Sequence, residues 1–358
     1  MGGDSYNKTR TGRGTGLNHS GRFESTEIEP DWSQLDFEDV PDRTHRLQTR
    51  YFEDTARTVI SQNDSPDIPF RYSLNPYRGC LHGCSYCYAR PTHEYLGMSA
   101  GLDFETKIFV KKNAPFLFAR WLCRRAYEPS PVMMSGVTDC YQPVERALEI
   151  TRGCLQVAAD ASQPMCIITK NASIRRDVDL LTSMAAKNLV RVAISITSLD
   201  QSLTKLLEPA TSAPAARLQT VKELSAAGIP VHILVAPVIP GLNDSEIPAI
   251  LEAAADAGAC SSSHILIRLP YSVKTIFADW LSQHKSSQAE KVLTRISNTR
   301  HGKLNDAEFG RRMRGSGPMA EQIAALFKVS ARRCQIDQQP TKLSVDQFRA
   351  PDRQGRLF

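Results

Sequence analysis

The 358-residue sequence has no long apolar run. Nowhere do about 18 apolar residues follow one another, which is the length that a transmembrane helix needs. Residues 1–8 contain no hydrophobic segment of a secretion signal. Tyr6 stands where the N-myristoylation pattern requires Ser or Thr after Gly2. We therefore expect a cytoplasmic protein that neither spans a membrane nor is secreted.

The sequence also lacks the cysteine pattern of a disulfide-stapled secreted domain. Its nine cysteines are spread over a long chain, and in a reducing compartment clustered thiols are more often metal ligands or catalytic groups. Six of them are scattered, at positions 123, 140, 154, 166, 260 and 334. Leucine-rich or helical-solenoid repeats are absent as well, which excludes a solenoid.

The overall composition is that of a globular protein, but the basic residues are unevenly distributed along the chain. Hydrophobic residues make up 41% of the chain, enough for one large barrel or two domains. The net charge is +6, and residues 285–333 alone carry eleven Lys or Arg against four Asp or Glu. The densest part, 300–315, mixes basic residues with Gly and one aromatic, which suits a polyphosphate backbone. A solvated helix face is the alternative interpretation.

The most informative motif is a cysteine loop within residues 75–90. Cys80, Cys84 and Cys87 follow a CxxxCxxC spacing. Three thiolates at this pitch can bind one metal ion or one [4Fe-4S] cluster, and an odd number leaves one iron of the cluster without a protein ligand, whereas four cysteines close it. Gly79 and Gly83 allow a tight turn whose amides point at the cluster. The spacing therefore indicates an open iron where another molecule can bind.

A structural zinc site is the alternative for this loop. The same three thiolates could bind Zn²⁺ together with His82 or His93 in a tetrahedral Cys₃His arrangement. Such a site would stabilise the loop without taking part in chemistry. The spacing alone leaves both interpretations open.

Short apolar runs alternate with helical patterns between two polar terminal segments. Six runs predict strands, at 70–74, 132–137, 166–169, 190–196, 231–238 and 265–269. The intervals are long enough for crossover helices, and right-handed crossovers would curl six βα units into an open, partial (β/α)6 TIM-like barrel. In such barrels chemistry gathers at the carboxyl ends of the strands, and the cysteine loop follows the first strand directly. Residues 106–111 predict an extra strand or a barrel edge.

Composition divides the chain into four parts. Residues 1–45 have few apolar side chains and predict a flexible arm. The α/β barrel is expected over 46–284, and a basic helical extension over 285–335. Residues 336–358 resemble the arm in composition and are expected to form a tail.

A barrel with this loop resembles the radical S-adenosylmethionine (SAM) superfamily, in which an aromatic residue such as Tyr86 precedes the last cysteine. The resemblance extends to the branch of spore photoproduct lyase, which is labelled DNA-repair-photolyase-like, and within it to an uncharacterised bacterial group. The stretches that carry it are 75–89, 90–97, 136–143, 167–171, 207–209 and 236–244.

The resemblance implies two cofactors. Cys80, Cys84 and Cys87 would hold a [4Fe-4S] cluster, whose free iron would bind SAM through its amino and carboxylate groups. Reduction of the sulfonium would yield methionine and a 5′-deoxyadenosyl radical, with the electron supplied by an external low-potential donor. A closed barrel mouth would then hold the abstracted hydrogen within reach of that radical.

The resemblance also assigns residues to SAM. Tyr86 is expected against the adenosine, and Lys170 and Ser195, at strand ends, are expected to reach the methionine or ribose part. A lysine ammonium suits a carboxylate or hydroxyl partner, although a surface lysine and a serine bonded to backbone are the alternatives. Glu208 and Arg217 would position the ribose or close a loop, or else they are charges on a helix surface.

One departure from spore photoproduct lyase concerns hydrogen return. The cysteine that gives a hydrogen atom back to the product radical in that enzyme aligns with Val137. Cys140 could take this catalytic role if the strand end bends, although three residues displace a side chain by several ångströms. Tyr88 could relay a radical. Thymine-dimer reversal and another hydrogen abstraction on a nucleic acid or other macromolecule are therefore equally compatible with the sequence.

The last five residues, 354–358, resemble the Gln-x-x-Leu-Phe peptides with which bacterial replication and repair proteins bind the sliding clamp. Gly355 stands where a larger apolar residue is usual. Leu357 and Phe358 would insert into an apolar groove of the clamp, or they fold back on the barrel.

Two classes of function remain. The first is a radical SAM enzyme acting on DNA, or on RNA or protein, with residues 285–333 contacting phosphates. The second is a non-catalytic nucleic-acid-binding protein in which the metal loop is structural.

Overall fold

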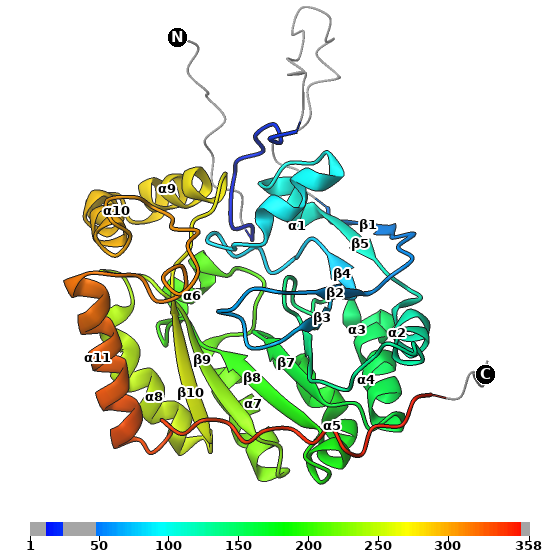
Figure 1. Ribbon diagram of the computed structural model, residues 1–358. Helices are drawn as coiled ribbons and strands as arrows, with labels where there is room; N and C mark the ends of the chain where they lie inside the picture. The colour runs from blue at the N-terminus through cyan, green and yellow to red at the C-terminus, as the bar shows by residue number, and fades with distance from the viewer. Residues whose placement is uncertain (1–11, 24–47, 352–358) are drawn as a thin grey trace, which may run out of the picture.

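A computed structural model describes residues 12–23 and 48–351, and its centre is a curved sheet with helices on its outer face (Figure 1). The strand order is β10-β9-β8-β7-β6-β3-β2. The strands are β2 (Ile60–Gln62), β3 (Tyr72–Leu74), β6 (Val132–Met134), β7 (Met165–Thr169), β8 (Val190–Ser195), β9 (Val231–Val238) and β10 (Ser261–Leu266).

The six strands from β3 to β10 are parallel and follow one another in chain order, while β2 pairs antiparallel with β3 at one edge. Their alternating or continuous burial reflects the Val- and Ile-rich runs that predicted them. In the part of the chain that the structure describes, β10 and β2 end the strand order, so the sheet is open. The predicted α/β fold with a parallel sheet of six units is confirmed.

The sixth strand lies earlier in the sequence than the run at 265–269. It begins at Ser261, and Ser261 and Ser263 hydrogen-bond the His232 ring of β9 at 2.8 and 2.7 Å. Polar side chains at this edge strand are thus satisfied across the sheet, which hid the strand from a hydrophobicity pattern. Ile267 and Leu269 are buried in a separate apolar cluster.

Helices of the outer layer connect the parallel strands. Those between strands β6 and β10 are α3 (Glu145–Leu148), α4 (Ile150–Asp160), α5 (Val178–Ala185), α6 (Gln201–Leu207), α7 (Pro214–Ala226) and α8 (Ile247–Asp256). Helix α7 ends before Gly228, whose φ of 75° is a left-handed conformation that glycine adopts freely.

After β10, the described part of the chain forms three further α-helices. They are α9 (Val273–His284), α10 (Ala289–Asn298) and α11 (Pro318–Arg333). Figure 1 shows α9 and α10 beyond the carboxyl ends of the strands, whereas α11 runs back beside α8. The sixth unit is therefore covered by α11, from the expected basic extension.

A second, three-stranded sheet supports the cysteine loop. Its order is β1-β5-β4, formed by β1 (Arg50–Glu53), β5 (Lys107–Val110) and β4 (Tyr77–Arg78). The run at 106–111 is thus an extra strand outside the main sheet. Helix α1 (Leu102–Thr106) precedes β5, and α2 (Ala114–Leu122) follows it.

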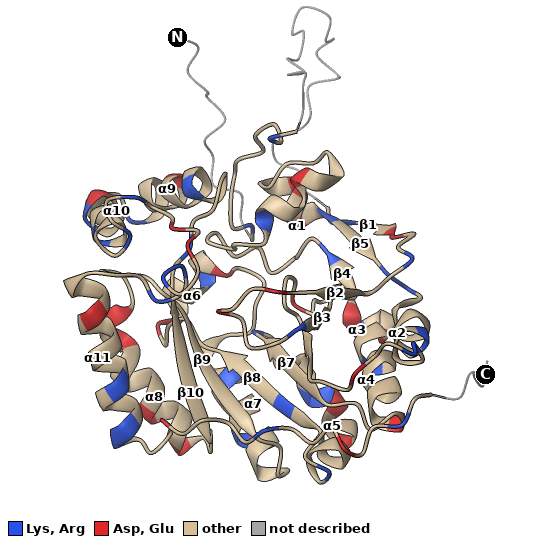
Figure 2. Cartoon of the chain, viewed as in Figure 1, with Lys and Arg blue, Asp and Glu red and all other residues tan. Residues whose placement is uncertain are grey.

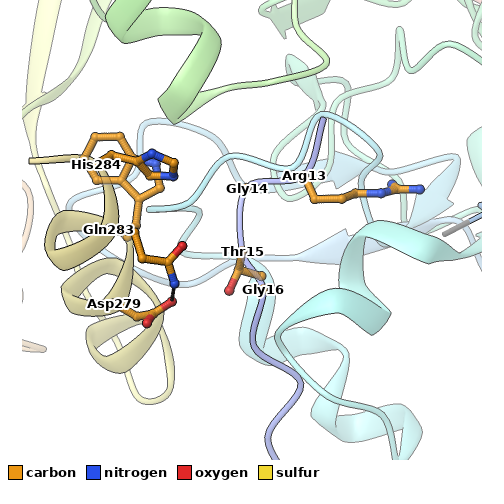
Figure 3. A pocket seen from close by; sticks show the side chains of 8 residues that line it. Arg13, Gly14, Thr15, Gly16, Asp279, Gln283 and His284 are labelled. Atoms are coloured by element: carbon orange, nitrogen blue, oxygen red, sulfur yellow. Dashed lines mark hydrogen bonds between the residues drawn. The ribbon is translucent and has the colours of Figure 1, made fainter. Parts of the chain in front are cut away.

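Residues 12–23 fall within the expected flexible arm, yet they pack against the cysteine loop and α1. The Gly14 amide donates to Glu105 Oε2 at 3.1 Å, and the Leu102 amide donates to the Leu17 carbonyl at 2.9 Å. Figure 3 shows this segment passing beside α9, with Thr15 opposite Gln283 across a small pocket. Polar and backbone contacts hold it, which is why its low apolar content gave no sign of packing.

Residues 336–351, from the expected tail, cross the amino ends of the strands (Figure 1). The Ser344 amide donates to the Asn188 carbonyl and the Arg349 amide to the Ala161 carbonyl, both at 2.9 Å. Leu343 is buried. The clamp-like motif at 354–358 lies outside the described residues. Among the described helices, none has the length and apolarity needed to cross a bilayer.

Candidate active site at the barrel mouth

The cysteine loop is held over the carboxyl ends of the strands by a buried arginine. Arg90 is fully buried and donates to the carbonyls of Cys84 at 2.9 Å and Gly83 at 3.2 Å. It also forms an ion pair of 2.5 Å with buried Glu105. Because both charges are removed from water, removing one partner would leave the other uncompensated. This pair fixes the loop on α1.

The three cysteines of the loop differ in exposure. Cys80 and Cys84 are buried, and Cys87 is half-buried. Burial raises the pKa of the Cys84 thiol well above its usual range, and it raises the pKa of Cys87 to about 11. The free thiols of Cys84 and Cys87 therefore stay protonated at neutral pH, so their ionisation is coupled to metal binding.

The loop conformation fits an iron–sulfur cluster. Gly79 and Gly83 have φ of 76° and 65°, and a Cβ on Gly83 would lie 2.8 Å from Glu105 Oε2. The Ser85 hydroxyl, between the second and third cysteines, is buried and has no hydrogen-bond partner among the described residues. A cluster sulfide or a cluster-bound molecule would offer it an acceptor.

The described residues show no preformed zinc site. Within residues 12–23 and 48–351, no three His, Cys, Asp or Glu side chains are grouped so as to hold one metal ion. His93 Nε2 lies 2.9 Å from the Lys107 carbonyl oxygen, whereas its Nδ1 is buried without a partner among the described residues. A [4Fe-4S] cluster asks for a different arrangement, because each thiolate binds a different iron.

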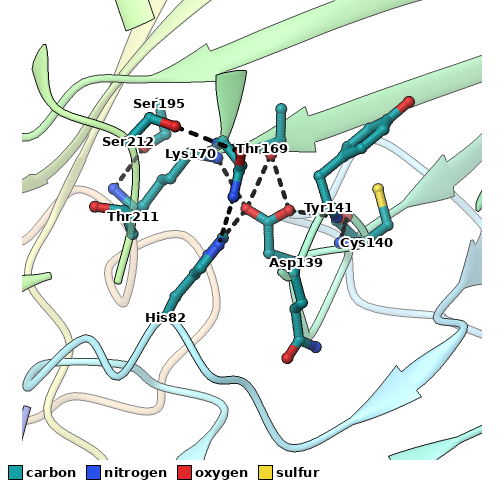
Figure 4. A network of polar contacts seen from close by, with 12 residues as sticks. His82, Asp139, Cys140, Tyr141, Thr169, Lys170, Ser195, Thr211 and Ser212 are labelled. Carbon is teal, nitrogen blue, oxygen red and sulfur yellow. Dashed lines mark hydrogen bonds and ion pairs between the residues drawn. The ribbon is translucent and has the colours of Figure 1, made fainter. Parts of the chain in front are cut away.

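His82 joins the loop to the ends of β6 and β7 (Figure 4). Its Nδ1 lies 3.4 Å from Asp139 Oδ2, and its Nε2 lies 3.2 Å from Asn171 Nδ2. Burial alone would lower the pKa of His82, but the charges of Asp139 and Cys80 raise it to about 10. Asp139 also accepts the Lys170 amide at 2.8 Å. His82, which also contacts Cys80, and Asp139 therefore link the cysteine loop to the ends of β6 and β7.

Lys170 is the centre of a second group of contacts at the mouth. Its ammonium lies 2.9 Å from Ser195 Oγ, 2.8 Å from Thr197 Oγ1, 2.9 Å from Glu208 Oε1 and 3.0 Å from the Ala236 carbonyl. These acceptors include residues at the ends of β8 and β9, so one ammonium joins three strand ends. Direct contact between Lys170 and a ligand would exchange one of the four acceptors, since an ammonium has three donors.

Glu208 and Arg217 complete this group, which we call the Lys170 hub. Both are buried at 1% exposure, and they form an ion pair. Burial would raise the pKa of Glu208, but Arg217 and Lys170 hold it well below its usual range. The Tyr86 hydroxyl donates to Glu208 and links the hub to the cysteine loop. The interpretation of Glu208 and Arg217 as helix-surface charges is therefore wrong.

The structure thus brings Tyr86, Lys170 and Ser195 together beside the cysteine loop. The sequence reasoning gave no role to Asp139 and Thr197. Their one signal was position, since Asp139 follows the strand of β6 and Thr197 follows β8, at the carboxyl ends where chemistry gathers.

Tyr88 and Cys140 are in different surroundings. Tyr88 is 48% exposed, and its hydroxyl donates to the Gly136 carbonyl at 2.7 Å. Cys140 is fully buried in the main core, and its side chain points away from the Asp139 carboxylate (Figure 4). Burial raises the pKa of the Cys140 thiol well above its usual range. The catalytic roles of both residues stay predictions.

The basic segment 300–315 is partly used inside the fold. Arg300 is 1% exposed and donates to the carbonyls of Ile267 at 2.6 Å and Arg312 at 3.0 Å. Arg312 forms an ion pair of 2.5 Å with Asp67, in the turn between β2 and β3. Figure 2 shows Lys and Arg spread over α10, the following loop and α11. The segment 300–315 therefore contacts both edges of the open sheet, at the end of β10 and at the turn between β2 and β3.

Comparison with curated proteins finds relatives without known function. An uncharacterised protein of Mycobacterium bovis is 37% identical over 218 residues, which are 60% of this chain and 64% of that protein. One of Methanocaldococcus jannaschii is 29% identical over 176 residues, 49% of this chain and 63% of that protein. The matched region thus spans less than two thirds of these relatives.

Comparison with solved structures finds the same fold. A variant of spore photoproduct lyase has a TM-score of 0.59 at 17% identity, with 79% of each chain covered. The lyase complexed with dinucleoside spore photoproduct has a TM-score of 0.58 at 16% identity and the same coverage. The model of the radical SAM superfamily matches residues 74–254, just over half of the chain. On the cysteine loop, the sheet and this match, the chain belongs to the radical SAM superfamily.

Proposed function

We propose that this chain is a radical SAM enzyme that abstracts a hydrogen atom from a nucleic acid, as a relative of spore photoproduct lyase. Enzymes of the superfamily bind a [4Fe-4S] cluster and SAM, which supply a 5′-deoxyadenosyl radical when an external donor provides an electron. The observation that carries the proposal is that Tyr86 joins the cysteine loop to the Lys170 hub at the carboxyl ends of the strands.

Each part of the mouth has a proposed role. Cys80, Cys84 and Cys87 would hold the cluster, since they share one tight loop. Tyr86 would lie against the adenosine of SAM. Lys170 and Ser195 would orient the methionine or ribose part, whose carboxylate or hydroxyls can replace an acceptor of the ammonium.

The buried ion pair between Glu208 and Arg217 keeps Tyr86 and Lys170 in place. Glu208 accepts from Lys170, Arg217 and Tyr86 at once, so the three side chains keep a fixed orientation without ligand. Preorganised polar groups need little rearrangement when a ligand binds. Glu208 and Arg217 are thus positioning residues.

The choice of nucleic acid as the substrate is supported by fold and charge. The structural relative is a lyase whose complex contains a dinucleoside spore photoproduct. In this chain the loop between α10 and α11 carries Lys303 and Arg314, which form no ion pair within the described residues. Basic side chains on this side of the sheet would attract phosphates.

Tyr88 is the candidate for relaying a radical, because it follows Cys87 directly and the residue is nearly half exposed. Hydrogen return by Cys140 would require its turn to open, since the thiol is fully buried. RNA or protein is the second candidate substrate class, and reversal of a thymine dimer is one reaction among several hydrogen abstractions.

Isotope transfer tests this proposal. The full chain, reconstituted without oxygen and reduced in the presence of SAM, is incubated with oligonucleotides deuterated at sugar and thymine methyl carbons. We expect deuterium in 5′-deoxyadenosine from one of these substrates. Deuterium transfer from a protein fraction but from no DNA or RNA would overturn the nucleic-acid assignment.

A further inference from the structure

Arg268 is an arginine at the barrel mouth that lacks an anionic partner. It lies two residues beyond the end of β10, and its Nε is buried without a hydrogen-bond partner. Its contacts are weak: Nη1 lies 3.6 Å from Met313 Sδ, and the guanidinium lies 5.6 Å from the centre of the Tyr88 ring. Within residues 12–23 and 48–351, no Asp or Glu forms an ion pair with it.

The other buried arginines of this region have more polar partners than Arg268, although Arg300 Nε is also buried without a partner. Arg90 has Glu105, Arg217 has Glu208, and Arg300 has four backbone carbonyls. Arg312 has Asp67. A partly buried guanidinium without an anion is costly, because burial removes water that would otherwise solvate the charge. Arg268 has neither a carboxylate, as Arg90, Arg217 and Arg312 have, nor the backbone carbonyls that Arg300 has.

The surroundings of Arg268 disfavour its charge when nothing is bound. Burial lowers the pKa of Arg268, and the neighbouring cation of Arg312 lowers it further. An anion between the two arginines and Tyr88 would reverse this, since opposite charges at close range favour the ionised form.

The position of Arg268 links it to the cysteine loop. Tyr88, whose ring it faces, follows Cys87 directly, and the Tyr88 hydroxyl is bonded to the end of β6. On the other side, the Leu266 amide donates to the Met313 carbonyl at 3.0 Å, which holds the 309–315 loop against β10. A group bound to Arg268 thus lies at the entrance to the proposed active site.

We propose that Arg268 binds a backbone phosphate of a nucleic-acid strand, whose adjacent base lies on the exposed rings beside it. This rests on the proposed function and names its substrate contact. A guanidinium offers a planar fork that matches a phosphate. Tyr88 and Phe309 are 48% and 55% exposed, and Phe309 lies 4.8 Å from the Arg312 guanidinium. Unstacked bases bind on such aromatic faces. A peptide carboxylate would satisfy the arginine but leave the rings unused.

The test is the salt dependence of binding of a fluorescent single-stranded oligothymidylate to the full, anaerobically reconstituted chain. We expect Arg268→Gln to weaken binding on the order of tenfold. The slope of the logarithm of the binding constant against the logarithm of salt concentration should become less negative by about 0.7, the value for one lost phosphate contact on a single strand. Arg268→Lys, which keeps the charge without the fork, should fall between the two. Arg125→Gln is the matched control, because Arg125 is exposed in the loop before β6.

Two outcomes would overturn the inference. One is an unchanged affinity and salt slope in Arg268→Gln. The other is an acidic peptide that competes as well as the oligonucleotide and depends equally on Arg268. Formation of 5′-deoxyadenosine without substrate separates this inference from the proposed function: its absence in the wild type contradicts the function, whereas its presence with unaltered binding in Arg268→Gln contradicts only the phosphate contact.

Discussion

At the scale of single residues, buried ion pairs hold the side chains at the barrel mouth in place. Glu208 is buried with Arg217 and Lys170, and Glu105 is buried with Arg90. Such pairs contribute little to stability when compared with an apolar core of equal volume, but they fix geometry and cannot be broken on one side without a large cost. The Lys170 hub is therefore expected to be rigid before any ligand binds.

Removing Glu208 tests this view of the hub. Glu208→Ala leaves the buried Arg217 without its carboxylate, so we expect the free energy of unfolding to fall by about 3–5 kcal/mol. The matched control is Glu223→Ala, which removes an exposed Arg–Glu pair with 41% exposure on each side and should cost about 0–1 kcal/mol. Denaturant unfolding under anaerobic conditions measures both. An equal loss of unfolding free energy in the two variants would contradict the view that Glu208 is a buried partner of Arg217 and Lys170.

Residue-level prediction from the sequence worked where position along a strand was informative. Tyr86, Lys170 and Ser195 were chosen from the motif and from strand ends, and the structure brings them into one group. It could not decide between a positioning role and a helix-surface location for Glu208 and Arg217, because a charged pair on a helix pattern looks the same whether it faces water or the core. Burial of a charge depends on tertiary packing, which local periodicity does not record.

At the scale of elements, the segment 12–23 shows how a glycine can decide packing. An added Cβ on Gly14 would lie 1.5 Å from the Gly83 carbonyl oxygen, in the cysteine loop. No side chain fits between these two backbones. The segment therefore covers the loop only because glycine stands at this position.

Gly14→Ala is expected to lift the segment from the loop. Amide exchange at Leu102, which donates to the Leu17 carbonyl, should rise as that hydrogen bond is lost. Gly12→Ala serves as the control, because an added Cβ at Gly12 meets no atom within 4 Å, although its φ of 83° makes alanine strained. Unchanged protection of Leu102 in Gly14→Ala would show that the segment is not held in this way.

The edge between β9 and β10 is expected to respond to pH. Burial lowers the pKa of His232 from its usual 6.5 to about 4, and both ring nitrogens bind serines of β10. The unfolded chain takes up a proton at higher pH than the fold does, so this contribution is complete above about pH 6.5 and is lost as the pH falls toward 4. Between pH 7.5 and 5, we expect a loss of about 1–2 kcal/mol.

The variant His232→Gln separates this effect from other titrations. It keeps hydrogen-bonding groups but cannot be protonated, so its stability should fall less than that of the wild type over the same pH range. Urea unfolding at the two pH values gives the difference. The same loss in wild type and variant would mean that His232 is not buried as a neutral ring.

Elements were predicted well where apolar runs mark buried strands, as for β9, whose bounds match the predicted run at 231–238. The start of β10 was missed because its serines are satisfied by His232. The packing of residues 12–23 was missed because backbone contacts and a glycine hold them, which composition does not reveal. Both failures arise from polar groups that find partners far away in the sequence.

At the scale of the whole molecule, the two ends of the sheet differ. Residues 336–351 cross the amino ends of the strands, where Leu343 is buried. The carboxyl ends carry the cysteine loop, the Lys170 hub and the 309–315 loop, with residues 12–23 alongside. The stabilising contacts of the tail lie away from the mouth, and the polar, glycine-rich segments lie around it. The molecule is thus arranged for chemistry at one end.

The most direct test of the central claim is the metal centre itself. Iron content, electron paramagnetic resonance and 5′-deoxyadenosine formation are measured together on anaerobically reconstituted protein reduced with SAM present. We expect a [4Fe-4S] cluster whose spectrum changes on addition of SAM, with 5′-deoxyadenosine formed by the wild type and lost in Cys84→Ser. A four-coordinate zinc centre with no cleavage of SAM would contradict the account.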